Sequence, residues 1–173
     1  MCLQKLFELF YPIPHMLTEW FGKKINKKRL LIYSLVFSPD GVSTAYLYND
    51  IAQGFQKSNY KVTVLTTTPH YNLIQESLDK QPLRKCVLGL FFTSNLNGIK
   101  VYHIPLKKYK NSLLRILSFI YWHLFSLIIG LFLKKPDIIL TPSPPLTSGL
   151  ISILLARIKG SKSIYNVQEI YPD

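Results

Sequence analysis

The sequence predicts an α/β fold in which helices cover both faces of a doubly wound, Rossmann-like parallel sheet. A nearly continuous apolar run, typical of a buried parallel strand, occupies residues 29–37, and residues 61–68 and 137–146 are predicted as further strands, the latter with a proline-rich end. The segments between them carry apolar residues at helical spacing. Strands that alternate with helices indicate crossover connections and therefore a parallel sheet.

The first strand and helix are predicted from residues 29–57. The run "RLLIYSLVF" reads as a strand, and Pro39 and Gly41 then mark a turn. Ser43 or Thr44 is expected to cap a helix whose core-facing stripe repeats every four residues, at Leu47, Ile51 and Phe55. The run "KVTVLTTT" is the second strand and "PHYN" a loop.

The later elements are predicted from the turn and capping residues that bound them. Residues 86–94 and 98–106 are predicted as two strands around Asn97-Gly98, a dipeptide typical of hairpins. A long apolar helix is expected over about 112–133, and a second over 148–160, closed by Gly160 as C-cap. Residues 161–170 form the last predicted strand.

Length and charge limit the functional classes. The 173 residues allow one domain with a core, 29–173, and the apolar content excludes a disordered chain. A net charge of +12 favours an anionic partner. Nucleic acid is not expected, because no recognition motif is present. Cys2 and Cys86 match no metal or redox spacing, so no metal site is predicted.

Residues 1–28 form a separate extension of bulky apolar residues with a basic end. Trp20 and Phe21, followed by lysines, resemble an interfacial anchor for an acidic membrane. A loosely packed extension or a misassigned start codon are the alternatives.

The long helix raises a membrane question, because residues 116–133 carry no formal charge and are just long enough to span a bilayer. The strands before and after it should share one sheet, which argues against a span. We expect a crossover helix that covers the sheet with one face and touches lipid with the other. A fully buried helix and a true span are the alternatives.

Candidate site residues follow the predicted strands, where open α/β sheets bind ligands. Asp40, Gly41, Val42 and Ser43 lead into a helix N-terminus, which favours phosphate, although Asp40 could only form a turn. His70 could bind or deprotonate a hydroxyl and Tyr71 could stack on a sugar, or both could only shape the turn.

The strongest candidates lie near the end of the chain. Gln168, Glu169 and Asp173 follow the last strand and could hold sugar hydroxyls or accept a proton. Capping of a helix by Asp173 is the alternative. The histidines that lie in apolar segments are predicted to be packing residues: His15, His103 and His123.

Several of these segments together resemble a known family. They are residues 31–72, "NGIKVYHIPL", "DIILTPSPPLTSGL" and "SIYNVQEIYPD". They look like the amino-terminal domain of family 4 glycosyltransferases, with the WbuB-like branch nearest. The resemblance covers about residues 29–173 and implies the amino-terminal half of a GT-B fold, incomplete at its carboxyl end.

The resemblance implies a function. Family members transfer a sugar with retention from a nucleoside-diphosphate donor, without a required cofactor, and this half mostly binds the acceptor. The first loop is often Gly-Gly in the family, whereas Gly41 here precedes Val42. Ser143 stands where many relatives carry a histidine that contacts the acceptor. A lipid-linked sugar acceptor and a peripheral position on the cytoplasmic face of the cell membrane are expected.

By the same resemblance the donor-binding domain lies outside this chain. A truncated product, an incomplete gene model or a split enzyme with a separate donor-domain subunit would each explain this. A non-catalytic, membrane-associated acceptor-binding subunit is the alternative function.

Overall fold

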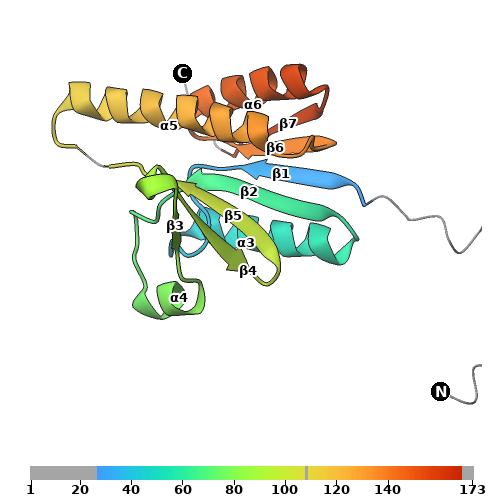
Figure 1. The fold of residues 1–173 in the computed structure, drawn as a ribbon, viewed down its shortest axis with the longest axis horizontal. Coiled ribbons are helices and arrows are strands. Elements are labelled where there is room, and N and C mark those ends of the chain that lie inside the picture. The colour runs from blue at the N-terminus through green and yellow to red at the C-terminus, as the bar shows by residue number, and fades with distance from the viewer. Residues whose placement is uncertain (1–26, 108, 169–173) are drawn as a thin grey trace, which may run out of the picture.

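The computed structural model describes residues 27–107 and 109–168 (Figure 1). Nearly all of the predicted extension lies outside these residues, as do the candidate residues Glu169 and Asp173. The elements in chain order are β1 (Arg29–Tyr33), α3 (Ser43–Lys57), β2 (Lys61–Thr67), α4 (Gln75–Lys80), β3 (Arg84–Cys86), the 3-10 turn η1 (Val87–Gly89), β4 (Phe91–Leu96), β5 (Ile99–Ile104), α5 (Ser112–Phe132), β6 (Ile138–Pro142), α6 (Leu146–Lys159) and β7 (Lys162–Asn166).

One seven-stranded sheet organises the molecule, in the order β3-β4-β5-β2-β1-β6-β7. Strands β5, β2, β1, β6 and β7 pair in parallel, in this order. Strands β3 and β4 extend the sheet beyond β5 with antiparallel pairing. The predicted Rossmann-like α/β class is confirmed. The predicted hairpin is confirmed too, because Leu96 pairs with Ile99 and both Asn97 (φ 49°) and Gly98 (φ 90°) adopt positive φ.

The prediction of one strand over 86–94 was wrong. The chain reverses within it: Cys86 ends β3 and pairs with Phe91 of β4, and Val87, Leu88 and Gly89 between them all have positive φ. Gly89 tolerates this backbone without cost. Leu88 points entirely into solvent. The apolar residues Val87 and Leu88 therefore belong to a turn. The alternation of side chains between the two faces of a strand is interrupted there.

Helices cover both faces of the sheet (Figure 1). On one face, α3 packs with Tyr48 and Ala52 on Ile32 and Val64. On the other, α5 and α6 cover a core of ten buried residues, from Leu31 and Tyr33 to Trp122 and Leu155. Trp122 of α5 stacks on Tyr33 of β1 with ring centroids 5.2 Å apart. This arrangement is the doubly wound one.

Two details of α3 correct the sequence prediction. Its buried residues are Ala45, Tyr48 and Ala52, whereas Leu47 is 48% exposed. The predicted stripe is therefore wrong at Leu47, whereas Ile51 and Phe55 do pack against the core as partly buried residues. Small alanines and a tyrosine form the fully buried part of the helix, because they fit its close approach to the sheet. The helix also begins at Ser43, with Val42 as N-cap and no capping side chain, so neither Ser43 nor Thr44 is the cap.

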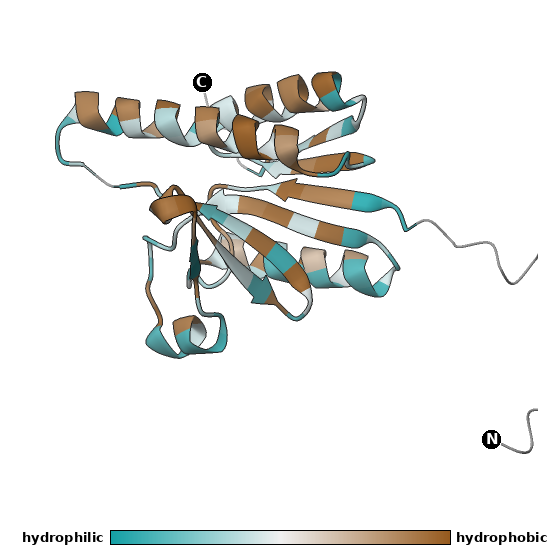
Figure 2. Ribbon diagram, viewed as in Figure 1, coloured by the Kyte–Doolittle hydropathy of each residue, from teal (hydrophilic) through white to brown (hydrophobic). Residues whose placement is uncertain are grey.

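The long helix α5 has one buried and one exposed face. Trp122, Ser126, Ile129 and Gly130 are buried, whereas only 17% of its most apolar window is covered. Within the described residues, it is the helix long and apolar enough to cross a membrane by length and composition. Figure 2 shows hydrophobic residues on nearly every turn of α5 and α6. The alternative of a fully buried helix is wrong, and packing of α5 on the sheet agrees with the expected crossover.

The carboxyl-terminal elements agree with prediction in type and differ at their ends. Helix α6 starts at Leu146, two residues early, and ends at Gly160 in the left-handed conformation (φ 61°), as predicted. Strand β7 is shorter than predicted and forms one edge of the described sheet. Ile164 and Val167 are 49% and 56% exposed there.

Candidate functional site

Asp40 fastens the loop after β1 to the loop after β2. Its buried carboxylate accepts three backbone N–H groups: from His70 and Tyr71 at Oδ2, both at 3.1 Å, and from Asn72 at Oδ1, at 2.7 Å. Hydrogen bonds to an ionised acceptor are the stronger kind. The geometry gives Asp40 a positioning role: its carboxylate holds the backbone of the "PHYN" loop.

Gly41 joins the same two loops from the other side. Its N–H donates to the Asn72 carbonyl at 2.9 Å, and the Asn72 side-chain amide donates to the Gly41 carbonyl at 2.8 Å. A Cβ at position 41 would lie 2.5 Å from Ile74 Cδ1. A side chain at position 41 would therefore displace the Ile74 side chain and press on the Asn72 amide that bonds the Gly41 carbonyl, which favours glycine here.

His70 and Tyr71 are presented together on this fastened loop. Their ring centroids lie 4.3 Å apart. His70 Nδ1 lies 2.8 Å from the Thr68 carbonyl, so the neutral ring carries its proton on Nδ1 and its lone pair on Nε2. The Tyr71 ring is 47% exposed, and partial burial with the nearby Asp40 charge raises the pKa of its hydroxyl. Such a pair can offer a stacking surface and an acceptor for a hydroxyl proton.

The N-terminus of α3 lies beside this loop. Val42 provides no side-chain cap, and the first intrahelical bond runs from the Tyr46 N–H to the Val42 carbonyl. Ser43 is exposed. The partial positive charge of a helix start favours negative ligands. Position and charge are thus compatible with the predicted phosphate contact.

Ser143 and Gln168 form a second group, at the ends of β6 and β7. The Gln168 N–H donates to Ser143 Oγ at 3.0 Å, and the Ser143 N–H donates to the Asn166 carbonyl at 2.9 Å. Ser143 is 4% exposed. Its hydroxyl therefore organises the start of the segment that carries the candidate carboxylates, Glu169 and Asp173, which lie outside the described residues.

The sheet thus gathers the described candidates at its carboxyl edge, in two groups. Asp40 to Ser43 adjoin His70 and Tyr71, whereas Ser143 adjoins Gln168. A hydrogen bond of 3.0 Å from Asn166 to the Tyr48 hydroxyl ties β7 to α3 between the groups. Two cavities in the described part of the chain, one at the starts of β1, β2 and β5 and one beside the first half of α5, are lined by none of the candidates. No group of His, Cys, Asp and Glu in residues 27–107 and 109–168 could hold a metal ion.

A buried polar network behind the first loop was not predicted. Gln81 donates to Ser94 Oγ, which lies 2.7 Å from His103 Nε2, and His103 Nδ1 lies 3.1 Å from the Thr67 carbonyl. Gln81 also bonds Ser38 through its amide nitrogen and oxygen. The hairpin register could have indicated part of this, because Ser94 and His103 are diagonal neighbours on one face.

The prediction that His103 is a packing residue is confirmed, since it is completely buried. Burial lowers the pKa of its ring to about 4, so the ring is neutral. With the proton on Nδ1 facing the Thr67 carbonyl, Nε2 accepts from Ser94. The network thereby holds the end of β2, from which the His70 loop begins.

His123 also has a structural role, as predicted. Its ring nitrogens lie 3.0 Å from the Tyr33 hydroxyl and 2.8 Å from Thr147 Oγ1. It therefore joins β1, α5 and α6 in one polar contact.

Comparison with known proteins gives the fold. No family model matches the sequence, and no curated protein matches it. Among solved structures, the catalytic domain of starch synthase IV from Arabidopsis thaliana, bound to ADP and acarbose, is similar with a TM-score of 0.54 and 13% identity over 82% of this chain. The chain matches one half of a GT-B fold. It spans 33% of the starch synthase chain.

A second similarity shows how widely such folds are used. Two crystal structures of the C-terminal domain of a hydrogenase from Pyrococcus furiosus give TM-scores of 0.52 and 0.51, each with 16% identity over 81% of this chain. The match covers 90% and 91% of the length of these two hydrogenase chains. Identities this low show the fold alone, and function has to be argued from the site.

Proposed function

We propose that this chain is the acceptor-side half of a GT-B glycosyltransferase of the family 4 type, which works on a lipid-linked sugar at the cytoplasmic face of the membrane. The donor, a nucleoside-diphosphate-sugar, would be held by a second domain or subunit that faces the carboxyl edge of the sheet. The transferred sugar would go to an acceptor hydroxyl.

The observation that carries the proposal is the presentation of His70 and Tyr71 by Asp40. An aromatic ring that packs on a sugar face and a base near neutral pH are what an acceptor site requires. Three backbone bonds hold both at the edge where open α/β sheets bind ligands. The α3 N-terminus beside them is suited to a diphosphate.

The outer faces of α5 and α6 support the membrane part of the proposal. They expose fifteen large apolar side chains: Leu113, Leu114, Ile116, Leu117, Ile120, Tyr121, Leu124, Ile128, Leu131, Phe132, Leu146, Leu150, Ile153, Leu154 and Ile158. Lys107, Lys110, Lys134 and Lys135 flank α5. An apolar face bounded by cations favours a helix lying in the interface of an anionic bilayer.

The test measures, by calorimetry, the binding of a water-soluble monosaccharide linked through a diphosphate to a short prenyl chain. Replacing Tyr71 by Ala removes the stacking surface and should weaken binding about threefold to tenfold, given about 0.5–1.5 kcal/mol for an aromatic contact. His70→Ala should weaken it as well. Leu88→Ala, a fully exposed residue in the turn between β3 and β4, is the control and should bind like the wild type. Equal affinity of the Tyr71 and Leu88 variants would refute the acceptor site.

Catalysis is tested separately. The 173-residue chain incubated with nucleotide-sugars and the same acceptor should yield no product, because the proposal assigns donor binding to a second domain. Turnover by the purified chain would contradict that assignment.

A second function, an acceptor-binding subunit without catalysis of its own, is favoured by one observation. The matched domain of the hydrogenase is covered along nine-tenths of its length, so a similar fold also occurs as the C-terminal domain of a protein named for a different activity. Product formation after addition of a donor half in trans would favour the enzyme, and tight acceptor binding without product would favour the subunit.

A further inference from the structure

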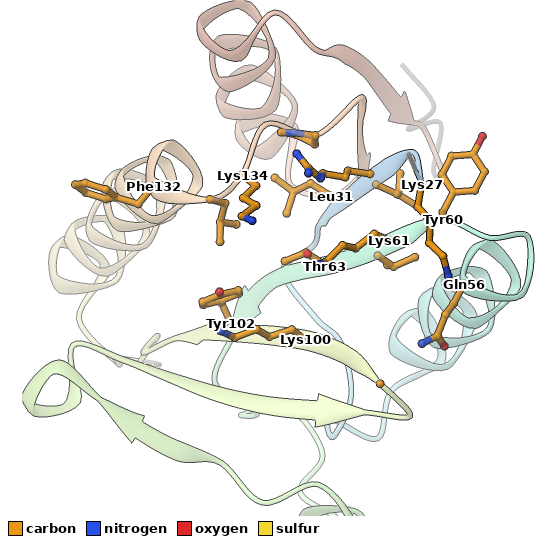
Figure 3. Close-up of a pocket in the computed structure, with 16 residues that line it drawn as sticks. Lys27, Leu31, Gln56, Tyr60, Lys61, Thr63, Lys100, Tyr102, Phe132 and Lys134 are labelled. Carbon is orange, nitrogen blue, oxygen red and sulfur yellow. The ribbon is translucent and has the colours of Figure 1, made fainter. Parts of the chain in front are cut away.

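A basic cleft lies at the amino edge of the sheet, at the opposite ends of the strands from the candidate site. Its volume is about 640 Å³. It is lined by the starts of β1, β2 and β5 and by the end of α5 (Figure 3). Neither the proposed acceptor site nor any donor contact uses it.

Five cations line this cleft, and no Asp or Glu does: Lys27, Arg29, Lys61, Lys100 and Lys134. They come from separate segments, and Figure 3 shows Lys61, Lys100 and Lys134 around one opening. One carboxylate lies next to the lining, that of Asp137, which accepts the Arg29 backbone N–H at 2.7 Å. It leaves most of the converging positive charge unbalanced, and a bound anion relieves the repulsion between the cations. Lys100 Nζ is placed 4.8 Å above the centre of the Tyr102 ring, which orients one of the cations.

The rim and floor of the cleft are apolar on the side of α5. Phe132, the last residue of α5, is 88% exposed at the rim, and Leu133 follows it. Lys134 comes next in the chain, at the same opening. The exposed apolar face of α5 therefore leads directly to the cluster of cations. Aromatic residues with adjacent lysines are typical of the boundary between acyl chains and headgroups.

We propose that this cleft binds the phosphate headgroup of an anionic phospholipid in the bilayer on which α5 lies. The five cations supply the counter-charge, Tyr102 and Leu31 line the inner wall, and Phe132 enters the acyl region. The inference rests on the membrane part of the proposed function. It adds a specific headgroup site, and with it a fixed rotation of the domain about the α5 axis.

The first experiment measures binding to vesicles of phosphatidylcholine, with and without phosphatidylglycerol. Lys100→Ala/Lys134→Ala removes two cleft charges and should lower affinity for the anionic vesicles about tenfold or more, since each basic residue near the surface contributes roughly 1 kcal/mol. Lys57→Ala/Lys80→Ala removes the same charge on elements away from α5 and should change affinity less than twofold. Equal losses in both variants, or no loss in the cleft variant, would overturn the proposal.

The second experiment locates the ligand and its source. Amide NMR shifts of Thr63 and Gly98, both in the cleft lining, should respond to soluble short-chain phosphatidylglycerol and not to short-chain phosphatidylcholine. Equal shifts with inorganic phosphate at the same concentration would show a simple phosphate site and overturn the lipid assignment.

The two proposals fail in different ways. The cleft variant should bind the soluble lipid-linked sugar with wild-type affinity, because the His70 loop lies at the other edge of the sheet. Loss of acceptor binding in Tyr71→Ala with intact headgroup shifts would support both sites. Unchanged acceptor binding in that variant would remove the acceptor site and leave the headgroup site standing.

Discussion

At the scale of single residues, Asp40 determines the conformation of the loop that presents His70 and Tyr71. Asp40→Ala removes the acceptor for three backbone N–H groups and should destabilise the protein by roughly 3 kcal/mol, because groups that bonded a charged partner lose it. Urea denaturation measures the loss, and amide exchange at residues 70–72 should accelerate more than in the strands. Asp50→Ala, an exposed residue of α3, is the control.

His103 should make stability depend on pH. Its folded pKa of about 4 lies below the ordinary value of 6.5, so between these values the unfolded chain binds more protons than the folded one. Stability is complete above pH 6.5 and should fall as the pH drops through that window, by about 3 kcal/mol at most. Thermal unfolding of His103→Gln, compared with the wild type over this range, should show a flatter dependence. A parallel dependence in both would contradict the assignment.

At the scale of elements, two glycines in helices should respond oppositely to alanine. Gly54 of α3 faces open space, so Gly54→Ala should stabilise by roughly 0.5–1 kcal/mol through helix propensity. A Cβ at Gly130 of α5 would lie 2.6 Å from Cδ2 of Leu155, which is buried in α6. Gly130→Ala should therefore destabilise, by about 1 kcal/mol. Denaturation midpoints of the two variants moving in the same direction would contradict this packing.

Among the parallel strands, β7 should be the least protected. It pairs with β6 on one side only within the described sheet, and Ile164 in it is half exposed. Edge strands of this kind open first and recruit other strands. Within the parallel part of the sheet, amide exchange should be fastest at residues 163–167 and slowest in β1 and at Val62 to Leu65. Equal protection in a monomeric chain would contradict this expectation.

The elements also show what sequence patterns can predict. Strand β1 was predictable because burial on both faces makes it nearly continuously apolar, and β2 and β6 were predictable from their β-branched and apolar residues. The Asn97-Gly98 hairpin and the Gly160 cap were predictable because each needs positive φ. The reversal at Val87 to Gly89 was not, since apolar residues occupy a turn there.

The location of the candidate site was predictable from the sequence, whereas the roles of its residues were predictable only in part. Asp40, His70 and Tyr71 follow strand ends, which sequence shows. That the Asp40 carboxylate bonds backbone N–H groups thirty residues away depends on how two loops meet. Gln81, Ser94 and His103 are far apart in sequence, and only the fold makes them one network.

At the scale of the whole molecule, the exposed apolar faces of α5 and α6 should govern where the protein is found. We expect peripheral attachment, so high salt or alkaline extraction should release at least part of it from membranes. Ile120→Ser/Leu124→Ser should increase the released fraction, since both side chains are about half exposed. Tags at the two ends that report opposite sides of the membrane would show that α5 spans it instead.

The attachment of the His70 loop has a consequence for its evolution and for engineering. Asp40 binds the backbone of residues 70–72, so these three hydrogen bonds do not require particular side chains at 70 and 71. Exchange of His70 removes the bond of its own ring to the Thr68 carbonyl. Leu73, 61% exposed beside them, adds a third variable position. A library diversified at these three positions, with Asp40 and Gly41 kept, should contain mostly folded members. Selection from it could alter acceptor preference while the scaffold stays constant.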